Sequence, residues 1–153
     1  MNKIFRILFV LVFFISGCSY EPIFISKKYD FKFEEIISDG DININKIIKK
    51  NLLERSSEIS EINYILNIIS KREKEVISSN TKGDPLVYKL KVNLKYYLYL
   101  NDKLIIENEI VKQTNYNNSN DKFELSKYED NILKNLSESI SSELLVSITT
   151  LKK

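Results

Sequence analysis

Apolar and polar residues alternate most regularly in the middle of the chain. Eight alternate positions between residues 86 and 100 are apolar or aromatic, namely Leu86, Tyr88, Leu90, Val92, Leu94, Tyr96, Leu98 and Leu100. A period of two places these side chains on one side of a strand. The other side carries Lys89, Lys91, Asn93, Lys95, Tyr97 and Tyr99. We therefore predict a long strand over residues 86–100 with one buried face.

Three further segments read as strands. Residues 61–77 alternate, with Ile62, Tyr64, Leu66 and Ile68 on one face and Ile65 and Ile69 on the other. A tight turn at Asn101-Asp102 leads into a strand over 104–114, and residues 115–121 are predicted to form a loop. A short first strand, 31–37, is predicted to end in the turn cluster 38–41.

Two segments show the period of an amphipathic helix. In residues 43–55 the apolar positions are Ile44, Ile47, Ile48 and Leu52, and Asp41, Asn43 or Asn45 could cap the helix. In the closing segment, 122–150, apolar residues recur every three or four positions from Leu125 to Leu151. Ser126 with Glu129 is a candidate capping box inside that segment.

These elements follow one another in the order β-α-β-β-β-α and predict a single α+β domain over residues 31–153. The strands cannot bury their apolar face alone, so we predict a four-stranded mixed sheet with both helices packed on one face. The other sheet face, which bears lysines and tyrosines, would be open to solvent or to a partner.

The first 17 residues have the features of an export signal. Lys3 and Arg6 precede nine consecutive apolar residues, Ile7 to Ile15, which are too few to span a bilayer as a helix. The sequence Ile15-Ser16-Gly17-Cys18 resembles a lipobox. We therefore predict a lipoprotein signal peptide over 1–17, lipidation of Cys18 and a tether over 18–30. A plain membrane anchor with an incidental cysteine is the alternative.

Lipidation would place a diacylglycerol and an N-acyl chain on Cys18, and two or more chains give stable membrane anchoring. In enterobacterial lipoproteins, Asp at the next position favours the inner membrane. Ser19 stands there in this chain, which favours the outer membrane, on its periplasmic side.

Composition excludes several classes of chemistry. The chain has no His and one Cys, so it can form no internal disulfide, and neither a Cys/His metal site nor a His-dependent triad is available. We expect no cofactor beyond the lipid. Loss of Lys3 and Arg6 leaves 21 basic and 21 acidic side chains, so the mature chain lacks the global positive field that nucleic acid binding requires.

Paired carboxylates are the remaining route to catalysis. Glu34 and Glu35 would point to opposite faces of a strand, whereas Glu107 and Glu109 would share one. Charges two residues apart are common on strands, and the chain has no His base and no Gly-rich loop. We therefore expect a protein that is not an enzyme.

The layout resembles the LptE family of lipopolysaccharide-assembly lipoproteins. An aromatic residue and a Pro soon follow the lipidated Cys in Cys18-Ser19-Tyr20-Glu21-Pro22, and Ser38-Asp39-Gly40 joins a strand to a short helix. The long strand begins after Gly83-Asp84-Pro85, and a closing helix ends the chain. The resemblance covers nearly all of the mature chain.

This resemblance implies that the chain partners the β-barrel LptD and contacts lipopolysaccharide. Candidate lipopolysaccharide-binding residues are Lys89, Lys91 and Lys95 on one strand face, with Arg72 and Lys74 as a second group. Tyr97 and Tyr99 are candidate partner-interface residues, since Tyr is enriched at interfaces. A solvated strand face is the plainer reading of the lysines. The alternative function is an accessory or pilot lipoprotein of a different outer-membrane complex.

Overall fold

The computed structural model describes residues 28–151 and contains four strands and two helices. The elements are β1 (Lys32–Gly40), α2 (Ile42–Arg55), β2 (Asn63–Ser79), β3 (Pro85–Leu100), β4 (Lys103–Asn117) and α3 (Lys122–Thr150). Their order confirms the predicted α+β architecture, β-α-β-β-β-α.

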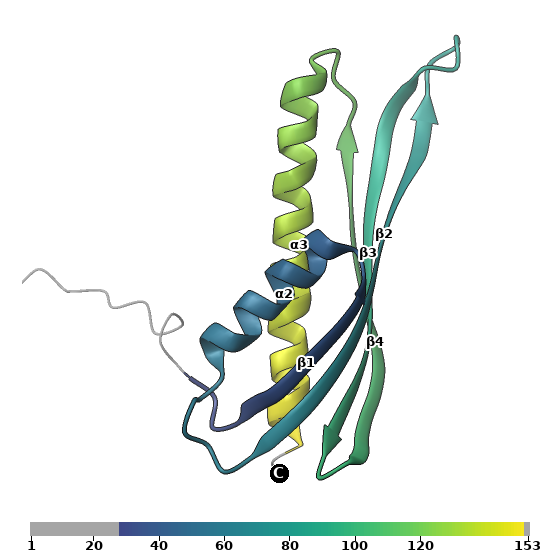
Figure 1. Cartoon of the computed structure of the whole chain (residues 1–153). Helices are drawn as coiled ribbons and strands as arrows, with labels where there is room; N and C mark the ends of the chain where they lie inside the picture. The colour runs from purple at the N-terminus through teal and green to yellow at the C-terminus, as the bar shows by residue number, and fades with distance from the viewer. Residues whose placement is uncertain (1–27, 152–153) are drawn as a thin grey trace, which may run out of the picture.

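The strands form one sheet in the order β1-β2-β3-β4. β1 runs parallel to β2, and the other two pairs are antiparallel, so the sheet is mixed as predicted. A parallel pair needs a crossover between its strands, and α2 provides it. Both helices lie on the same side of the sheet, α3 along its length and α2 across α3 (Figure 1). Within residues 28–151, no helix covers the opposite face of the sheet.

The core lies between the sheet and the two helices. The central alternate positions of β3 are buried, namely Leu90, Val92, Leu94, Tyr96 and Leu98. They belong to one apolar cluster with side chains from α2 and α3, among them Ile44, Ile48, Leu52, Ile140, Leu144 and Leu145. The predicted buried face is thus confirmed at its centre. It fails at Leu86, which is 49% exposed, because the tip of the β2–β3 hairpin bends away from α3 (Figure 1).

The junction between β1 and α2 is tighter than the sequence predicted. β1 continues through Gly40, so the predicted turn over residues 38–41 was wrong, and only Asp41 separates strand from helix. Gly40 has φ +92°, and a Cβ at that position would lie 1.9 Å from the carbonyl oxygen of Ser70. Asp41 caps α2 by accepting hydrogen bonds from the amides of Asn43 and Ile44. Only glycine allows β1 to lie so close to β2 here.

The segment between β4 and α3 is also shorter than predicted. β4 reaches Asn117 because Tyr116 is buried and donates a hydrogen bond to Glu129 at 2.8 Å. Burial, followed by that hydrogen bond, raises the pKa of Tyr116. The N-cap of α3 is Asp121, which accepts from two amides, so the capping box predicted at Ser126 was wrong.

The predicted signal peptide, Cys18 and most of the predicted tether lie outside the described residues. The part of the tether that is described already contacts the domain. The amide of Tyr29 donates to the carbonyl of Arg55 at 2.8 Å, and Tyr29 forms a parallel bridge with Ser56. Phe31, two residues on, is buried. The chain therefore enters the domain beside the C-terminal end of α2.

Candidate functional site

The sheet face opposite the helices gathers the candidate residues of β3. Register places side chains of neighbouring strands in rows across this face, which we call the open face. One row contains Ile37, Asn67, Tyr97 and Glu107, and the next contains Asp39, Ile69, Lys95 and Glu109. Further toward the β2–β3 tip, Glu73 stands opposite Lys91 and Glu75 opposite Lys89.

The half of the open face nearer the β3–β4 turn is apolar and aromatic. A shallow hollow of about 270 Å³ is lined there by Ile37, Asp39, Asn67, Ile68, Ile69, Tyr97 and Tyr99. Ile37 and Ile69 are 49% and 45% exposed, and the two tyrosines are half-buried. We call this region the Tyr97 hollow. Aliphatic side chains left exposed beside two tyrosines have the composition of a protein interface.

Asn67 adds a polar side chain to the lining of the Tyr97 hollow. Its Oδ1 atom is buried yet accepts no hydrogen bond from any described residue. Buried side-chain acceptors in folded proteins nearly always have a donor. Asn67 lines the hollow, but its Oδ1 atom is enclosed within the protein and is not accessible to a partner.

The other half of the open face is charged but internally neutralised. Its ion pairs are Lys71–Glu73 at 2.7 Å, Lys91–Glu73 at 3.2 Å and Lys89–Glu75 at 3.6 Å. Hydrogen bonds from Lys71 and then Lys91 lower the pKa of Glu73. The predicted lysines Lys89 and Lys91 therefore lie on one face, as expected, but each already contacts a carboxylate.

Lys95 lies where the apolar and the charged halves of the open face meet. Its Nζ lies 3.0 Å from Glu107 and 5.0 Å from the centre of the Tyr97 ring. Hydrogen bonding to Tyr97 and then to Glu107 raises the pKa of Lys95, so the ammonium stays charged at neutral pH. Lys95 therefore orients the aromatic residue that borders the Tyr97 hollow.

The second predicted basic group lies on the opposite side of the sheet, facing the helices. Arg72 contacts the N-cap Asp41 at 3.2 Å, and Lys74 contacts Glu129 of α3 at 2.6 Å. Lys74 also lies 4.1 Å from the centre of the Tyr88 ring. The structure thus separates Arg72 and Lys74 from the open-face lysines and uses them to connect the sheet to both helices.

The candidate carboxylates do not form a catalytic pair. Glu107 and Glu109 share the open face, but Glu107 pairs with Lys95 and Glu109 accepts a hydrogen bond from Asn93. Within residues 28–151, no three acidic or Cys side chains come together as metal ligands. Neither described helix is long and apolar enough to cross a membrane.

Tyr97 and Tyr99 were predicted from the sequence, but the residues that complete their surroundings were not. Ile37 comes from β1 and Asn67 and Ile69 from β2, and only the sheet register brings them beside Tyr97. The sequence indicated only part of this group. Alternation placed Ile69 on the open side, but Ile37 stood at the end of a short predicted strand whose register was unknown.

Comparison with solved structures finds the same fold in bacterial lipoproteins. The chain matches rare lipoprotein B from Shewanella oneidensis with a TM-score of 0.59 and 13% identity, over 77% of this chain and 96% of that one. It matches lipoprotein B from Nitrosomonas europaea at 0.61 and 14%, over 84% and 88%. A minor lipoprotein from Acinetobacter baumannii gives 0.58 and 10%, over 82% and 95%.

No protein-family model and no curated protein sequence matches the chain. The shared feature is therefore the fold, since identities of 10–14% establish nothing finer. That fold is consistent with the resemblance to the LptE family drawn from the sequence.

Proposed function

We propose that this chain is an LptE-like outer-membrane lipoprotein that partners an LptD-like β-barrel in lipopolysaccharide assembly and transport. The observation that carries the proposal is the open face. An apolar hollow bordered by Tyr97 and Tyr99 lies on the side of the sheet that neither described helix covers, in a fold shared with three bacterial lipoproteins. The role is that of an accessory protein without catalysis, as the relatives favour.

The chemistry of the open face suits a protein partner. Its lysines are neutralised by glutamates within the face, so an approaching partner meets little net charge. Around the Tyr97 hollow, the exposed Ile37 and Ile69 can be buried against apolar side chains of a barrel wall. Removing such area from water contributes about 25 cal/mol per Å².

The entry point of the chain sets how the domain would sit on the membrane. Cys18 precedes the first described residue by ten positions. Ten extended residues reach at most about 35 Å. The 29 residues of α3 span about 43 Å, so the segment after Cys18 cannot reach along the whole length of that helix. Lys28 leads into Tyr29, which pairs with Ser56 at the C-terminal end of α2. We infer that this end lies nearest the lipid anchor and that the β2–β3 tip points away from it (Figure 1).

The role of the basic residues in binding lipopolysaccharide stays a prediction. Lys89, Lys91 and Lys95 each contact a glutamate, so a lipid A phosphate would have to replace a carboxylate at each position. Arg72 and Lys74 are likewise paired, with Asp41 and Glu129. A lipopolysaccharide phosphate carries more charge than a carboxylate, which is what would make such an exchange favourable.

Co-purification from native membranes tests the proposal. The detergent-solubilised full chain should be recovered in a 1:1 complex with a large β-barrel. The double substitution Ile37→Lys with Ile69→Lys should abolish recovery of the barrel, because it places two charges in the Tyr97 hollow.

The matched control is Leu53→Lys, which changes a comparably exposed aliphatic residue on α2 and should leave the complex intact. Recovery of the chain alone, or with a ring-shaped complex of another kind, would contradict the barrel partnership. Such a ring would favour the alternative role as an accessory or pilot lipoprotein. Loss of the complex in the control variant would show that the open face is not the specific surface.

A further inference from the structure

The segment between α2 and β2 exposes an aliphatic side chain where the chain enters the domain. Ile59 is 93% exposed, the highest value among the large hydrophobic side chains of residues 28–151. We call residues 56–62 the Ile59 loop. Leu53, in the last turn of α2, is a second exposed aliphatic residue next to this loop. Neither side chain belongs to the open face or to the apolar core.

Hydrogen bonds hold the backbone of the Ile59 loop in place. The amide of Ser57 donates to the carbonyl of Phe31 at 2.8 Å, which connects the loop to the start of the domain. The hydroxyl of Ser57 accepts from the amide of Ile59 at 3.3 Å. That of the buried Ser60 accepts from the amide of Ile62 at 3.1 Å. The exposed position of Ile59 is therefore built into the fold.

The tether predicted from the sequence reaches the domain beside Ile59. Lys28, the first described residue, lies 3.8 Å from Glu58, the residue before Ile59. Cys18 precedes Lys28 by ten positions, so a lipid on Cys18 can lie at most about 35 Å from Lys28. The lipid would therefore keep the Ile59 loop close to the bilayer surface.

The charges around the Ile59 loop nearly cancel. Within residues 28–32 and 54–61, the basic residues are Lys28, Lys32 and Arg55, and the acidic residues are Asp30, Glu54, Glu58 and Glu61. Attraction to anionic headgroups requires an excess of lysine and arginine, which this surface does not have. Its chemistry suits an apolar contact with zwitterionic phospholipid.

We propose that the Ile59 loop inserts into the surface of a zwitterionic phospholipid bilayer and thereby orients the anchored domain. The inference rests on the lipidation of Cys18, which belongs to the proposed function, and not on a barrel partner. Burial of one Ile side chain favours the inserted over the free state by roughly tenfold. That preference is too small to bind a free protein. The lipid makes the contact intramolecular, so that a weak interaction suffices.

Fluorescence of the lipidated chain in vesicles tests the insertion. The chain contains no Trp, so Ile59→Trp gives a single emitter. In phosphatidylcholine vesicles its emission should shift to shorter wavelength, and brominated phosphatidylcholine should quench it.

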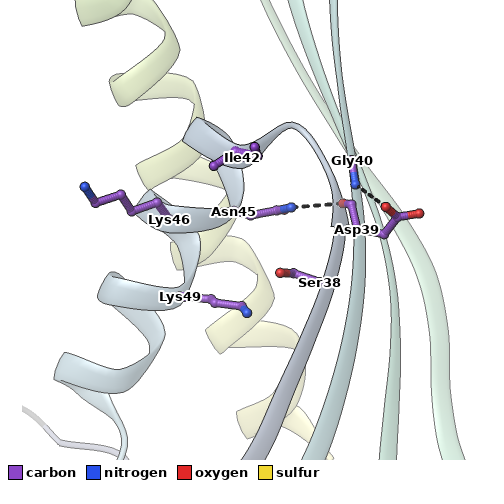
Figure 2. Close-up of a pocket in the computed structure, with 7 residues that line it drawn as sticks. All are labelled: Ser38, Asp39, Gly40, Ile42, Asn45, Lys46 and Lys49. Carbon is purple, nitrogen blue, oxygen red and sulfur yellow. Dashed lines mark hydrogen bonds between the residues drawn. The ribbon is translucent and has the colours of Figure 1, made fainter.

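The matched control is Ile42→Trp, which also replaces a highly exposed isoleucine. Figure 2 shows Ile42 in the first turn of α2, at the opposite end of that helix from the Ile59 loop. Its emission should remain that of a Trp in water, with little quenching by the brominated lipid. Equal quenching at the two positions would overturn the proposal.

Trp itself favours membrane interfaces, so a second measurement uses no introduced Trp. Trypsin cleavage after Lys28 releases the domain from vesicles, and insertion should slow it by holding Lys28 against the bilayer. Ile59→Ser should speed release about tenfold, whereas Ile59→Leu and Ile42→Ser should release the domain as slowly as the parent chain does. An unchanged melting temperature checks that the fold is kept. Unchanged release in Ile59→Ser would contradict the insertion.

Lipid composition and native membranes separate the alternatives. Quenching that requires anionic phosphatidylglycerol and is lost at high salt would overturn the apolar contact. Loss of the barrel from Ile59→Ser, with no quenching of Ile59→Trp in vesicles, would assign the loop to a protein partner and overturn the proposal. A native chain without acyl groups on Cys18 would overturn both this inference and the lipoprotein part of the proposed function. Quenching of a lipidated chain that recovers no barrel would support this inference and overturn only the barrel partnership.

Discussion

The open face and helix α2 both carry lysines, yet their lysines have opposite surroundings. On the open face, Lys89 and Lys91 each stand opposite a glutamate of β2 and pair with it. On α2, Lys46 and Lys49 have no acidic partner among the described residues. A lysine in the sequence is therefore a candidate to contact an anion only where the fold leaves it without an acidic partner.

The strongest perturbation of the fold is expected at Gly40, at the end of β1. Gly40→Ala should lower the free energy of unfolding by about 3 kcal/mol, because it adds a clash with the Ser70 carbonyl to the strain of a positive φ. Chemical denaturation of the full chain measures this effect.

Gly83→Ala is the matched control for that substitution. Gly83 has φ +90°, but a Cβ there would meet no atom within 4 Å. The control should therefore lose only about 1 kcal/mol, the cost of the backbone conformation alone. Equal losses at the two glycines would mean that the contact between β1 and β2 at Ser70 does not constrain the fold.

Replacing lysines with glutamate should lower the melting temperature more on the open face than on α2. Replacing Lys89, Lys91 and Lys95 together with Glu puts like charges opposite one another, so the melting temperature should fall by roughly 2–5 °C. The fold should survive, and binding of lipopolysaccharide should weaken if our sequence prediction holds. Calorimetry and a lipopolysaccharide binding assay on the same sample measure both effects.

The comparison variant carries Lys46→Glu and Lys49→Glu on α2. Neither lysine has an acidic partner that an introduced glutamate would repel, so the melting temperature should change by less than about 1 °C. A fall equal to that of the open-face variant would show that pairing does not distinguish the two regions. Unchanged lipopolysaccharide binding in the open-face variant would remove Lys89, Lys91 and Lys95 from the candidate ligands.

The smallest expected effect is the pH dependence of the pairs around Glu73. Hydrogen bonds from Lys71 and Lys91 lower the pKa of Glu73 below its ordinary value of 4.5. The pairs therefore stabilise the fold fully above pH 4.5, and that contribution is lost as the pH falls through the lowered pKa of the folded state. Carbon-13 NMR of the Glu73 carboxyl group across this range measures the shift.

Glu73→Gln provides the matching stability test. The variant should be slightly less stable than the parent chain at neutral pH, and the two should become equal in acid once Glu73 is protonated. Lys91→Gln should move the pKa of Glu73 part of the way back toward 4.5. A stability difference that persists unchanged at acid pH would mean that the ion pairs contribute nothing to it.

Much of the fold could be predicted because period and propensity are local properties. The alternation of β3 predicted its buried face from Leu90 to Leu98, and the repeat of Ile132, Ile140 and Ile148 predicted the buried side of α3. The turn at Asn101-Asp102 also holds, with φ of 49° and 61°, as a tight hairpin needs. Strand ends were predicted less well, because Tyr116 extends β4 through a contact with Glu129 that is distant in sequence.

The candidate sites were predicted less completely than the fold. Tyr97 and Tyr99 could be placed on the open side from alternation alone, but the glutamate partners of the lysines depend on strand register. Asn45 was considered only as a helix cap, since its neighbour Asp39 lies in β1 and the polar contact between them forms only when the helix packs. Such contacts join side chains that no periodic pattern relates.

The sequence by itself determined the element order, the buried side of each central element, the absence of His chemistry and the prediction that Cys18 is lipidated. These follow from residue types and spacings along one segment at a time. Only the tertiary structure decided which lysines are neutralised, which polar atoms are left without a donor and where the Tyr97 hollow lies. The physical reason is that electrostatic pairing and burial depend on distances between segments, which are set when β1, β2 and α2 pack together.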